Sequence, residues 1–224
     1  MSASLLAAVS VAAVLALALL WRVLRRGARP PAAAIVESHS LTSLDDATGA
    51  VRSVQTAVVT LPAQALEAIW SPEYLERLAR TYWRFLSRVT LGLVQVRYSE
   101  HERWIVLFGA LKLLTFHAPE YEMDSAHGLV RWRIARGVLV AKRGRDGGGY
   151  LQIEVRRNPG EDGAQAHLRM AVEVANFYPS IASGLSRRLY EATQSRIHVI
   201  VTNRFLHSLV RLDLAESRVG RYRA

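Results

Sequence analysis

The chain has 224 residues, half of them hydrophobic, which is enough for one membrane or targeting segment and one domain with a sizeable core. It contains no cysteine, and this excludes disulfides, thiolate catalysis and cysteine-ligated metal sites. The formal net charge of +10 favours partners that carry phosphate, either anionic lipid or nucleic acid.

The first predicted element is an apolar helix from Ala3 to Trp21, which is about the length that a helix needs to cross the hydrocarbon of a bilayer. Positive charge follows this run rather than preceding it, so the positive-inside rule places the C-terminal bulk of the chain in the cytoplasm. A secretory signal peptide cleaved near residues 32–34 is the alternative, but such a signal carries its charge first. We therefore predict a single-pass membrane protein in which residues 1–26 form the anchor and its basic flank. The predicted membrane-surface residues are Trp21, Arg22, Arg25, Arg26 and Arg29.

Residues 27–50 are small, polar and proline-containing, and they predict a linker between the anchor and a domain. The domain begins near Val51 with a strand rich in Val and Thr that ends at Pro62. A short helix is expected over residues 63–70. Ser71 and Pro72 then suit the cap and first position of a second helix, which runs to about residue 85.

Six further strands follow in the sequence pattern. In the last three, apolar and polar residues alternate; Val130, Trp132 and Ile134, for example, oppose Arg131 and Arg133. A sheet with one dry and one wet face is expected to be antiparallel and covered on one side. The six predicted strands are 90–98, 103–108, 111–117, 130–134, 151–156 and 168–174.

Residues 180–212 contain no proline and a single glycine, and they predict one helix of about 50 Å. A basic tail, residues 213–224, ends the chain. The predicted fold class is α+β: a curved antiparallel sheet of about six to seven strands packs on a long C-terminal helix. Two short helices follow the first strand, and a transmembrane helix precedes the domain.

Three segments carry a resemblance to a known family: ALEAIWSPEYLERL after the first strand, RWRIARG before a glycine-rich turn, and FYPSIASGL at the start of the last helix. With the order of elements, they make residues 51–212 resemble the START-like, or helix-grip, superfamily, which includes polyketide cyclase-like and coenzyme-Q-binding proteins. The resemblance implies an apolar cavity between the sheet and the long helix, with the two short helices closing one end.

Candidate ligand-binding residues come from that expectation. On the long helix, Leu189 and Ile200 share one arc with Arg196, Asn203 and His207. Arg196 and Asn203 are candidates to hold the polar head of an otherwise apolar ligand; alternatively, Arg196 pairs with a carboxylate of the sheet. The aromatic candidates for the cavity lining, which would otherwise be ordinary core, are Trp104, Phe108, Phe116, Trp132, Tyr150 and Phe177.

Other local patterns predict connections rather than chemistry. HAPEYEMD (117–124) gathers four side chains that can ligate metals, but without a firm ligand spacing it predicts a polar strand end and turn. RGRDGGGY (143–150) lacks the Lys-Ser/Thr of a phosphate loop and predicts a hairpin turn. There is no catalytic triad, and we predict no catalytic residue, no metal and no cofactor.

The function that these features predict is a membrane-tethered domain that binds or transports a hydrophobic ligand such as a lipid, a quinone or an isoprenoid. One alternative is a cyclase or dehydratase that uses His117 or His207 as general acid or base. Another is a scaffold with a filled interior that binds proteins through the sheet edge or the basic tail. Nucleic-acid binding is not expected, because no recognition module accompanies the positive charge.

Overall fold

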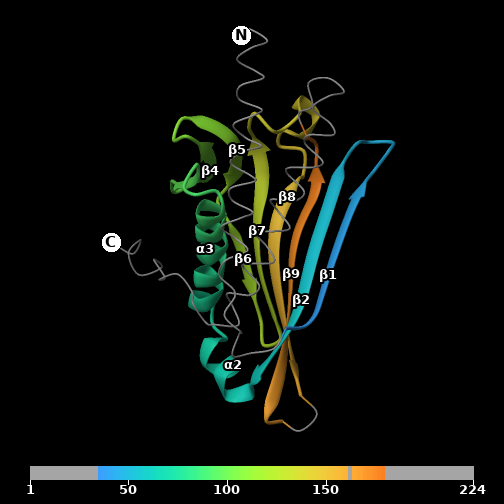
Figure 1. Ribbon diagram of the computed structural model, residues 1–224, viewed down its shortest axis with the longest axis vertical. Coiled ribbons are helices and arrows are strands. Elements are labelled where there is room, and N and C mark those ends of the chain that lie inside the picture. The colour runs from blue at the N-terminus through green and yellow to red at the C-terminus, as the bar shows by residue number, and fades with distance from the viewer. Residues whose placement is uncertain (1–34, 161–162, 180–224) are drawn as a thin grey trace.

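The computed structural model describes residues 35–160 and 163–179, which form one antiparallel sheet with two helices against one face (Figure 1). The helices are α2 (Ala63–Ile69) and α3 (Pro72–Val89), and a short 3-10 turn, η1, covers Lys142–Gly144. The strands are β1 (Ile35–Leu44), β2 (Val51–Pro62), β3 (Val94–Tyr98), β4 (Glu102–Leu107), β5 (Leu111–His117), β6 (Glu120–Met123), β7 (His127–Arg136), β8 (Tyr150–Pro159) and β9 (Gln165–Phe177).

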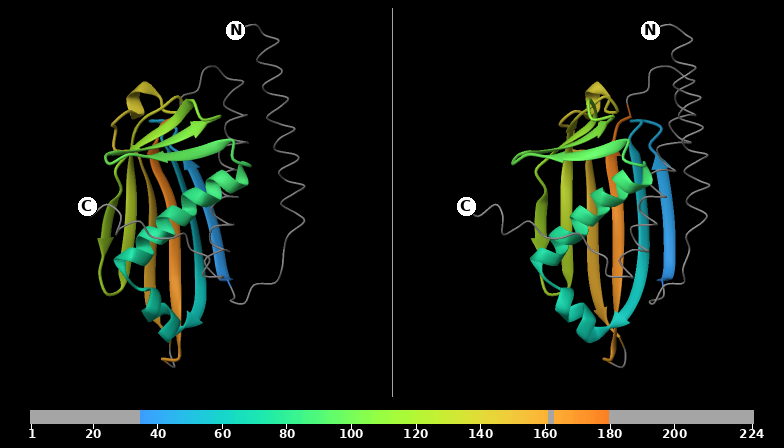
Figure 2. Two further views of the ribbon diagram at one scale, coloured as in Figure 1. Left: turned by 90° about the vertical axis from the view of Figure 1, so that its left-hand side faces the viewer. Right: turned by 60° about the vertical axis from the view of Figure 1, so that its left-hand side comes forward.

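The strands follow the order β1-β2-β9-β8-β7-β5-β4-β3, and β6 pairs with β7 beside β5. Strand β7 is therefore shared: its first half pairs with β6, whereas its end pairs with β5 through only Thr115↔Arg136 and Phe116↔Ile134. A register shift interrupts even this short pairing. The sheet turns at this junction, so that β3, β4 and β5 run across the end of the long strands (Figure 2).

The predicted linker is wrong for residues 35–44, because these residues form the edge strand β1. The strand pairs with β2 from Leu44↔Val51 to Ile35↔Val59, with one irregularity near its start. Its residues 39–44 are exposed and mostly polar, so they show no apolar alternation by which a strand is recognised. The turn that joins the two strands is held by Asp45, whose carboxylate accepts the N–H groups of Ala47 and Thr48, each at 2.9 Å.

Nine strands are present in the described part of the chain, against the six to seven predicted. Besides β1, the additional strand is β6, which occupies a segment that was expected to be only a strand end and turn. The other predicted strands and the two helices after β2 are confirmed, with shifted ends. β3 starts four residues later than predicted, because Leu91 has a left-handed φ of 53° and the Thr90 hydroxyl binds the carbonyl of Leu86 at 2.9 Å.

Helix α3 begins where the sequence predicts. Ser71 has extended backbone angles and its hydroxyl accepts the N–H of Tyr74 at 3.4 Å, while Pro72 is the first helical residue. The helix then continues to Val89, one turn beyond the expected end. Figure 2 shows it lying obliquely across one face of the sheet.

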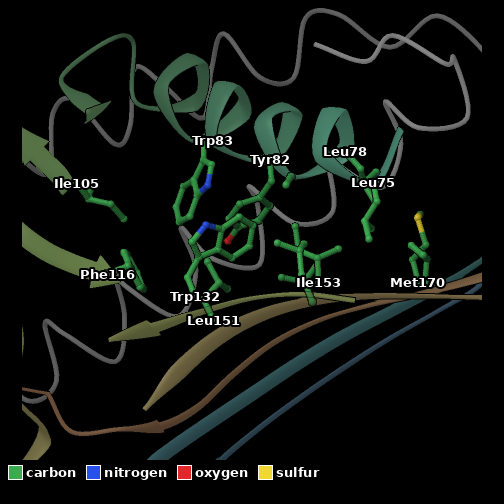
Figure 3. Packing of buried hydrophobic residues seen from close by; sticks show 14 of the residues in the cluster. Leu75, Leu78, Tyr82, Trp83, Ile105, Phe116, Trp132, Leu151, Ile153 and Met170 are labelled. Carbon is green, nitrogen blue, oxygen red and sulfur yellow. The ribbon is translucent and has the colours of Figure 1, made fainter. Parts of the chain in front are cut away.

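The core is aromatic where α3 crosses the middle of the sheet. Tyr82 and Trp83 point from the helix toward the strands, as Figure 3 shows. The ring of Trp83 lies 5.0 Å from that of Trp132 and 5.7 Å from that of Phe116, in edge-on and tilted arrangements. This aromatic contact holds α3 on the sheet. Near the first turn of the helix, the side chains that pack on the sheet are smaller.

The predicted transmembrane helix, the basic flank, the long C-terminal helix and the tail lie outside the described residues. Within residues 35–160 and 163–179, no helix is long and apolar enough to span a bilayer.

Candidate functional site

A cavity of about 60 Å³, partly open to solvent, lies between α2, the first half of α3 and the sheet. Strands β2, β8 and β9 form its floor, and Met123 of β6 closes one side. The lining residues that carry a polar side-chain atom are Trp70, Ser71 and Tyr74. The remaining lining is aliphatic or thioether: Val59, Leu61, Leu66, Ile69, Leu75, Leu78, Val155, Leu168, Met170 and Met123.

The two helices are placed over this floor by the break between them. Pro62 ends β2, and the chain turns into α2 directly below the sheet. The indole nitrogen of Trp70 donates to the carbonyl of Asp124 at 2.9 Å, and the guanidinium of Arg157 stacks on the same ring at 5.0 Å. Arg157 also pairs with Glu67 of α2 at 2.6 Å. The lower end of the cavity is thus fastened to the sheet by polar contacts.

The inner face of β2 changes from polar to apolar along its length. Ser53 and Gln55 come first, and Ala57, Val59 and Leu61 follow on the same side. At about 3.4 Å per residue, Gln55 lies about 14 Å from Val59 in the cavity wall. One continuous strand face therefore connects a polar end to the apolar cavity.

Gln55 is only 4% exposed, and its amide is incompletely satisfied. Its nitrogen donates to the hydroxyl of Ser53 at 3.0 Å, and Ser53 in turn shares a 2.9 Å hydrogen bond with Thr42 of β1. The amide oxygen has no hydrogen-bond partner among the described residues. A buried acceptor without a donor is costly, so this position suits a hydrogen-bond donor supplied from outside.

Gln55 and Ser53 were not among the predicted site residues, although the sequence contains a signal for them. Both lie at inward positions of a strand that was predicted from its Val and Thr content, without regard to which residues alternate inward. A glutamine at an inward strand position is unusual, because amides are mostly exposed in folded proteins.

Three of the predicted aromatic residues are in the core. Phe116, Trp132 and Phe177 are all buried, but none of them lines the cavity. Trp132 packs against the ring of Trp83 in the middle of the sheet, and Phe116 packs against the same Trp83 ring (Figure 3). Trp132 and Phe116 therefore belong to the core between α3 and the sheet, beside the cavity.

The other three aromatic candidates lie elsewhere. Trp104 is half-buried, with its ring beneath the ammonium of Lys112 at 4.9 Å. Tyr150 precedes the inward Leu151 on β8, so it belongs to the outer face, where Arg131 lies 5.0 Å from its ring. Phe108 was expected to face the interior, and this is wrong: the residue sits in the β4–β5 turn with a left-handed φ of 50° and an exposed ring.

The candidate residues of the long helix, which are Leu189, Arg196, Ile200, Asn203 and His207, lie outside the described residues. The same holds for the membrane-surface set of Trp21, Arg22, Arg25, Arg26 and Arg29. Their roles stay predictions.

The carboxylates of residues 120–124 serve local structure. Glu120 binds the guanidinium of Arg133 at 2.6 Å, and this hydrogen bond is the main reason that the pKa of Glu120 lies below its usual value. Asp124 accepts the N–H groups of Ala126 and His127 at the β6–β7 turn, which lowers its pKa as well. Within the part of the chain that the structure describes, no three metal-ligand side chains gather.

Three histidines of the described residues have a carboxylate partner, but none of these pairs lines the cavity; His101 lies 3.8 Å from Glu100 in the exposed β3–β4 turn. His117 lies 3.1 Å from Asp146 on the surface, and His127 lies 3.1 Å from Glu154 across β7 and β8.

Tyr121 of β6 lies beside α3. Desolvation of the Tyr121 hydroxyl raises its pKa to about 12, and the Glu76 carboxylate adds to the effect. The phenol of Tyr121 is therefore neutral at physiological pH.

Comparison with known proteins identifies no family for this chain. No protein-family model matches it, and no curated protein does. Among solved structures, the solution structure of CalU16 from Micromonospora echinospora is similar over 88% of this chain and 85% of its own, at 14% identity and a TM-score of 0.32. The crystal structure of CalU16 covers 78% of this chain and 86% of its own, at 9% identity and a TM-score of 0.27. Because both scores are low, the function has to be argued from the geometry of this chain.

Proposed function

We propose that this chain is a START-like domain that binds a hydrophobic ligand, such as a lipid, a quinone or an isoprenoid, next to a membrane that holds its N-terminus. The observation that carries the proposal is the apolar cavity between α2, α3 and the sheet. Cavities with mostly apolar walls and a few polar groups are typical of small-molecule sites.

The size of the cavity limits what enters it. A volume of about 60 Å³ holds roughly four to six water-sized groups, which is the end of a hydrocarbon chain rather than a whole lipid. Each square ångström of apolar ligand surface that leaves water there contributes about 25 cal/mol. The described cavity is thus proposed to take the apolar end of the ligand.

The polar end of the ligand is proposed to lie at Gln55. Its unpartnered amide oxygen accepts a hydrogen bond, so the matching ligand group is a donor such as a hydroxyl. The distance of about 14 Å along β2 suits a molecule with a head at Gln55 and a chain that reaches the cavity. Arg196 and Asn203 remain proposed as further head-binding groups.

The membrane part of the proposal comes from the sequence. The apolar run from Ala3 to Trp21, with arginines after it, supports a single-pass anchor and a domain in the cytoplasm. A short tether keeps the domain at a high effective concentration near ligands that partition into the bilayer.

The test uses the full chain in lipid nanodiscs and a long-chain alcohol with a diazirine at its last carbon. After irradiation, peptide mapping should find the adduct on cavity residues such as Leu75 and Met170. Leu168→Trp fills the cavity and should reduce this adduct about tenfold or more, because overpacking excludes the chain end. The matched control is Leu114→Trp, at another half-buried leucine that lies outside the cavity wall.

Adducts that stay on residues 3–21, or that are equal in both tryptophan variants, would contradict ligand binding and favour the protein-binding scaffold. The cyclase or dehydratase alternative needs a histidine–carboxylate pair inside the cavity. The three pairs found in the described residues lie outside it, and His207 is not described, so no observation favours that alternative.

A further inference from the structure

Five large apolar side chains are exposed at one end of the molecule, where three turns meet. We call them the apolar tip: Leu91, Leu93, Phe108, Leu111 and Val138. Their exposed fractions run from 38% for Leu93 to 73% for Phe108. None of them lines the cavity, and none is used in the proposed function.

Hydrogen bonds and strand pairing hold the three turns together. The N–H of Phe108 donates to the carbonyl of Leu93 at 2.9 Å, which joins the α3–β3 turn to the β4–β5 turn. Leu111 pairs with Leu107 across that second turn. The N–H of Val138 donates to the carbonyl of Lys112 at 3.2 Å and so brings the segment after β7 to the same place.

The backbone presents these side chains in an unfavourable conformation. Leu91 and Phe108 have φ values of 53° and 50°, in the left-handed region, which costs a residue with a side chain roughly 1–2 kcal/mol. Each is followed by a glycine that is also left-handed, at Gly92 and Gly109. Strain of this kind is found mainly where a function requires it.

The segments that form the tip carry charge of one sign, and Glu102, within electrostatic reach of Lys112, lies just outside them. The segments 86–99, 103–116 and 131–145, which supply all five side chains, contain no aspartate or glutamate. They carry exposed cations instead, among them Arg88, Arg97 and Lys112. The guanidinium of Arg97 lies against Gly109 at the turn itself, 3.4 Å from the place of a Cβ atom.

We propose that the apolar tip docks on an anionic lipid bilayer: its five side chains enter the interface, and the surrounding cations contact lipid phosphates. Apolar groups with a cationic rim are the combination that an anionic membrane surface attracts. A second copy of the chain suits the tip less well, because it would bring Arg88, Arg97 and Lys112 against the same cations. The tip is separate from the predicted anchor, which tethers the chain but does not orient the domain.

Because the natural chain has no cysteine, a single probe can be placed without removing any other residue. Phe108→Cys, labelled with nitrobenzoxadiazole, reports on the tip of the full-length protein. Ser125→Cys is the matched control, since Ser125 is exposed just before β7 whereas Val138 follows the strand. The length of β7 thus separates Ser125 from Val138, and so from the apolar tip, by about 30 Å.

Both labelled proteins are reconstituted in vesicles of phosphatidylcholine, with or without phosphatidylglycerol. With phosphatidylglycerol, the label at position 108 should shift to the blue and be quenched by lipids with a nitroxide on the acyl chain, whereas the label at 125 should not respond. Arg88→Gln, Arg97→Gln and Lys112→Gln together should lower the ratio of docked to free tip about a hundredfold. High salt should act in the same direction.

A label at position 108 that stays in water at low salt with phosphatidylglycerol would overturn the proposal. So would a blue shift that depends on protein density in the membrane rather than on lipid charge, because this indicates a contact between copies. The probe on the otherwise natural chain decides the question even if the triple variant folds poorly. Labelling of the cavity by the diazirine alcohol does not depend on the tip, so the two proposals fail separately.

Discussion

The side chain of Gln55 combines burial with an open hydrogen-bonding position. Its nitrogen is engaged by Ser53, but its oxygen faces no donor in the described residues. If Gln55 were only a core residue, its unpaired oxygen would lower the stability of the fold and serve no function. A binding role gives the residue a reason to be glutamine.

Gln55→Met separates these two roles. Methionine has a similar length and no unsatisfied atom, so the free energy of unfolding should stay the same or rise by up to about 1 kcal/mol. The affinity for a long-chain alcohol should fall about three- to tenfold, as expected for one lost hydrogen bond. Urea denaturation and competition with the diazirine alcohol measure the two quantities. A clear loss of stability with unchanged affinity would instead show that the amide is structural.

Single residues were the hardest to assign from the sequence. Trp132 could be placed inward because Arg131 and Arg133 flank it on a strand, and it is buried. The same alternation cannot tell a residue that lines a cavity from one that packs below it. The prediction for Phe108 was wrong because the sequence does not indicate that this phenylalanine has a left-handed backbone. That conformation depends on the turn around it.

Helix α3 packs on the sheet beside a glycine of β7. A Cβ atom at Gly128 would lie 2.8 Å from a methyl group of Val155 and 3.6 Å from Leu75 of the helix. Both neighbours belong to the cavity wall. A side chain at position 128 would therefore clash with its cross-strand neighbour Val155 and would meet the helix at ordinary contact distance.

Gly128→Ala should destabilise the fold by about 1–3 kcal/mol, because the added methyl group overpacks this contact. Val155→Ala removes the methyl group that lies nearest, so the double variant should lose less than the sum of the two single losses. Thermal unfolding of the three variants forms the cycle. Strictly additive losses would contradict direct contact between the two positions.

At the scale of elements, alternation and caps were enough for most of the sheet and for both helices. Ser71 and Pro72 marked the start of α3 because the cap chemistry is local. β1 and β6 could not be recognised in this way. They are held by backbone pairing to β2 and β7, and their own side chains are largely polar or exposed. Pairing through the backbone, even with the next strand along the chain, leaves no mark on the side chains of an edge strand.

Across the whole molecule, the sheet consists of two parts joined at β7. The strands β2, β9, β8 and β7 pair over long registers, whereas β5 joins β7 through two residue pairs only. The small part, β3 to β5, carries four of the five tip residues in the turn before β3, in the β4–β5 turn or at a strand end, and the large part carries the cavity floor. The proposed ligand contact in the cavity and the proposed bilayer contact at the tip thus belong to different parts of the sheet.

Hydrogen exchange should show this division. Amides of β8 and β9 are expected to exchange most slowly, because pairing on both sides and core burial protect them. Amides of β3 to β5 should exchange faster and as a group, since their attachment to β7 is short. Exchange followed by mass spectrometry measures both sets. Equal protection of the two parts would show that the junction is stronger than its pairing indicates.

The outermost strand has a consequence for how copies of the protein meet. Beyond β1 the sheet order has no further described strand, and the exposed side chains of this strand are Leu41 and Leu44 as well as His39, Ser40 and Ser43. Residues 39–44 contain no aspartate, glutamate, lysine, arginine or proline, the residues that usually keep a sheet edge from pairing with another copy. At this border only the polar imidazole and hydroxyls oppose stacking into fibres, and the two leucines favour it.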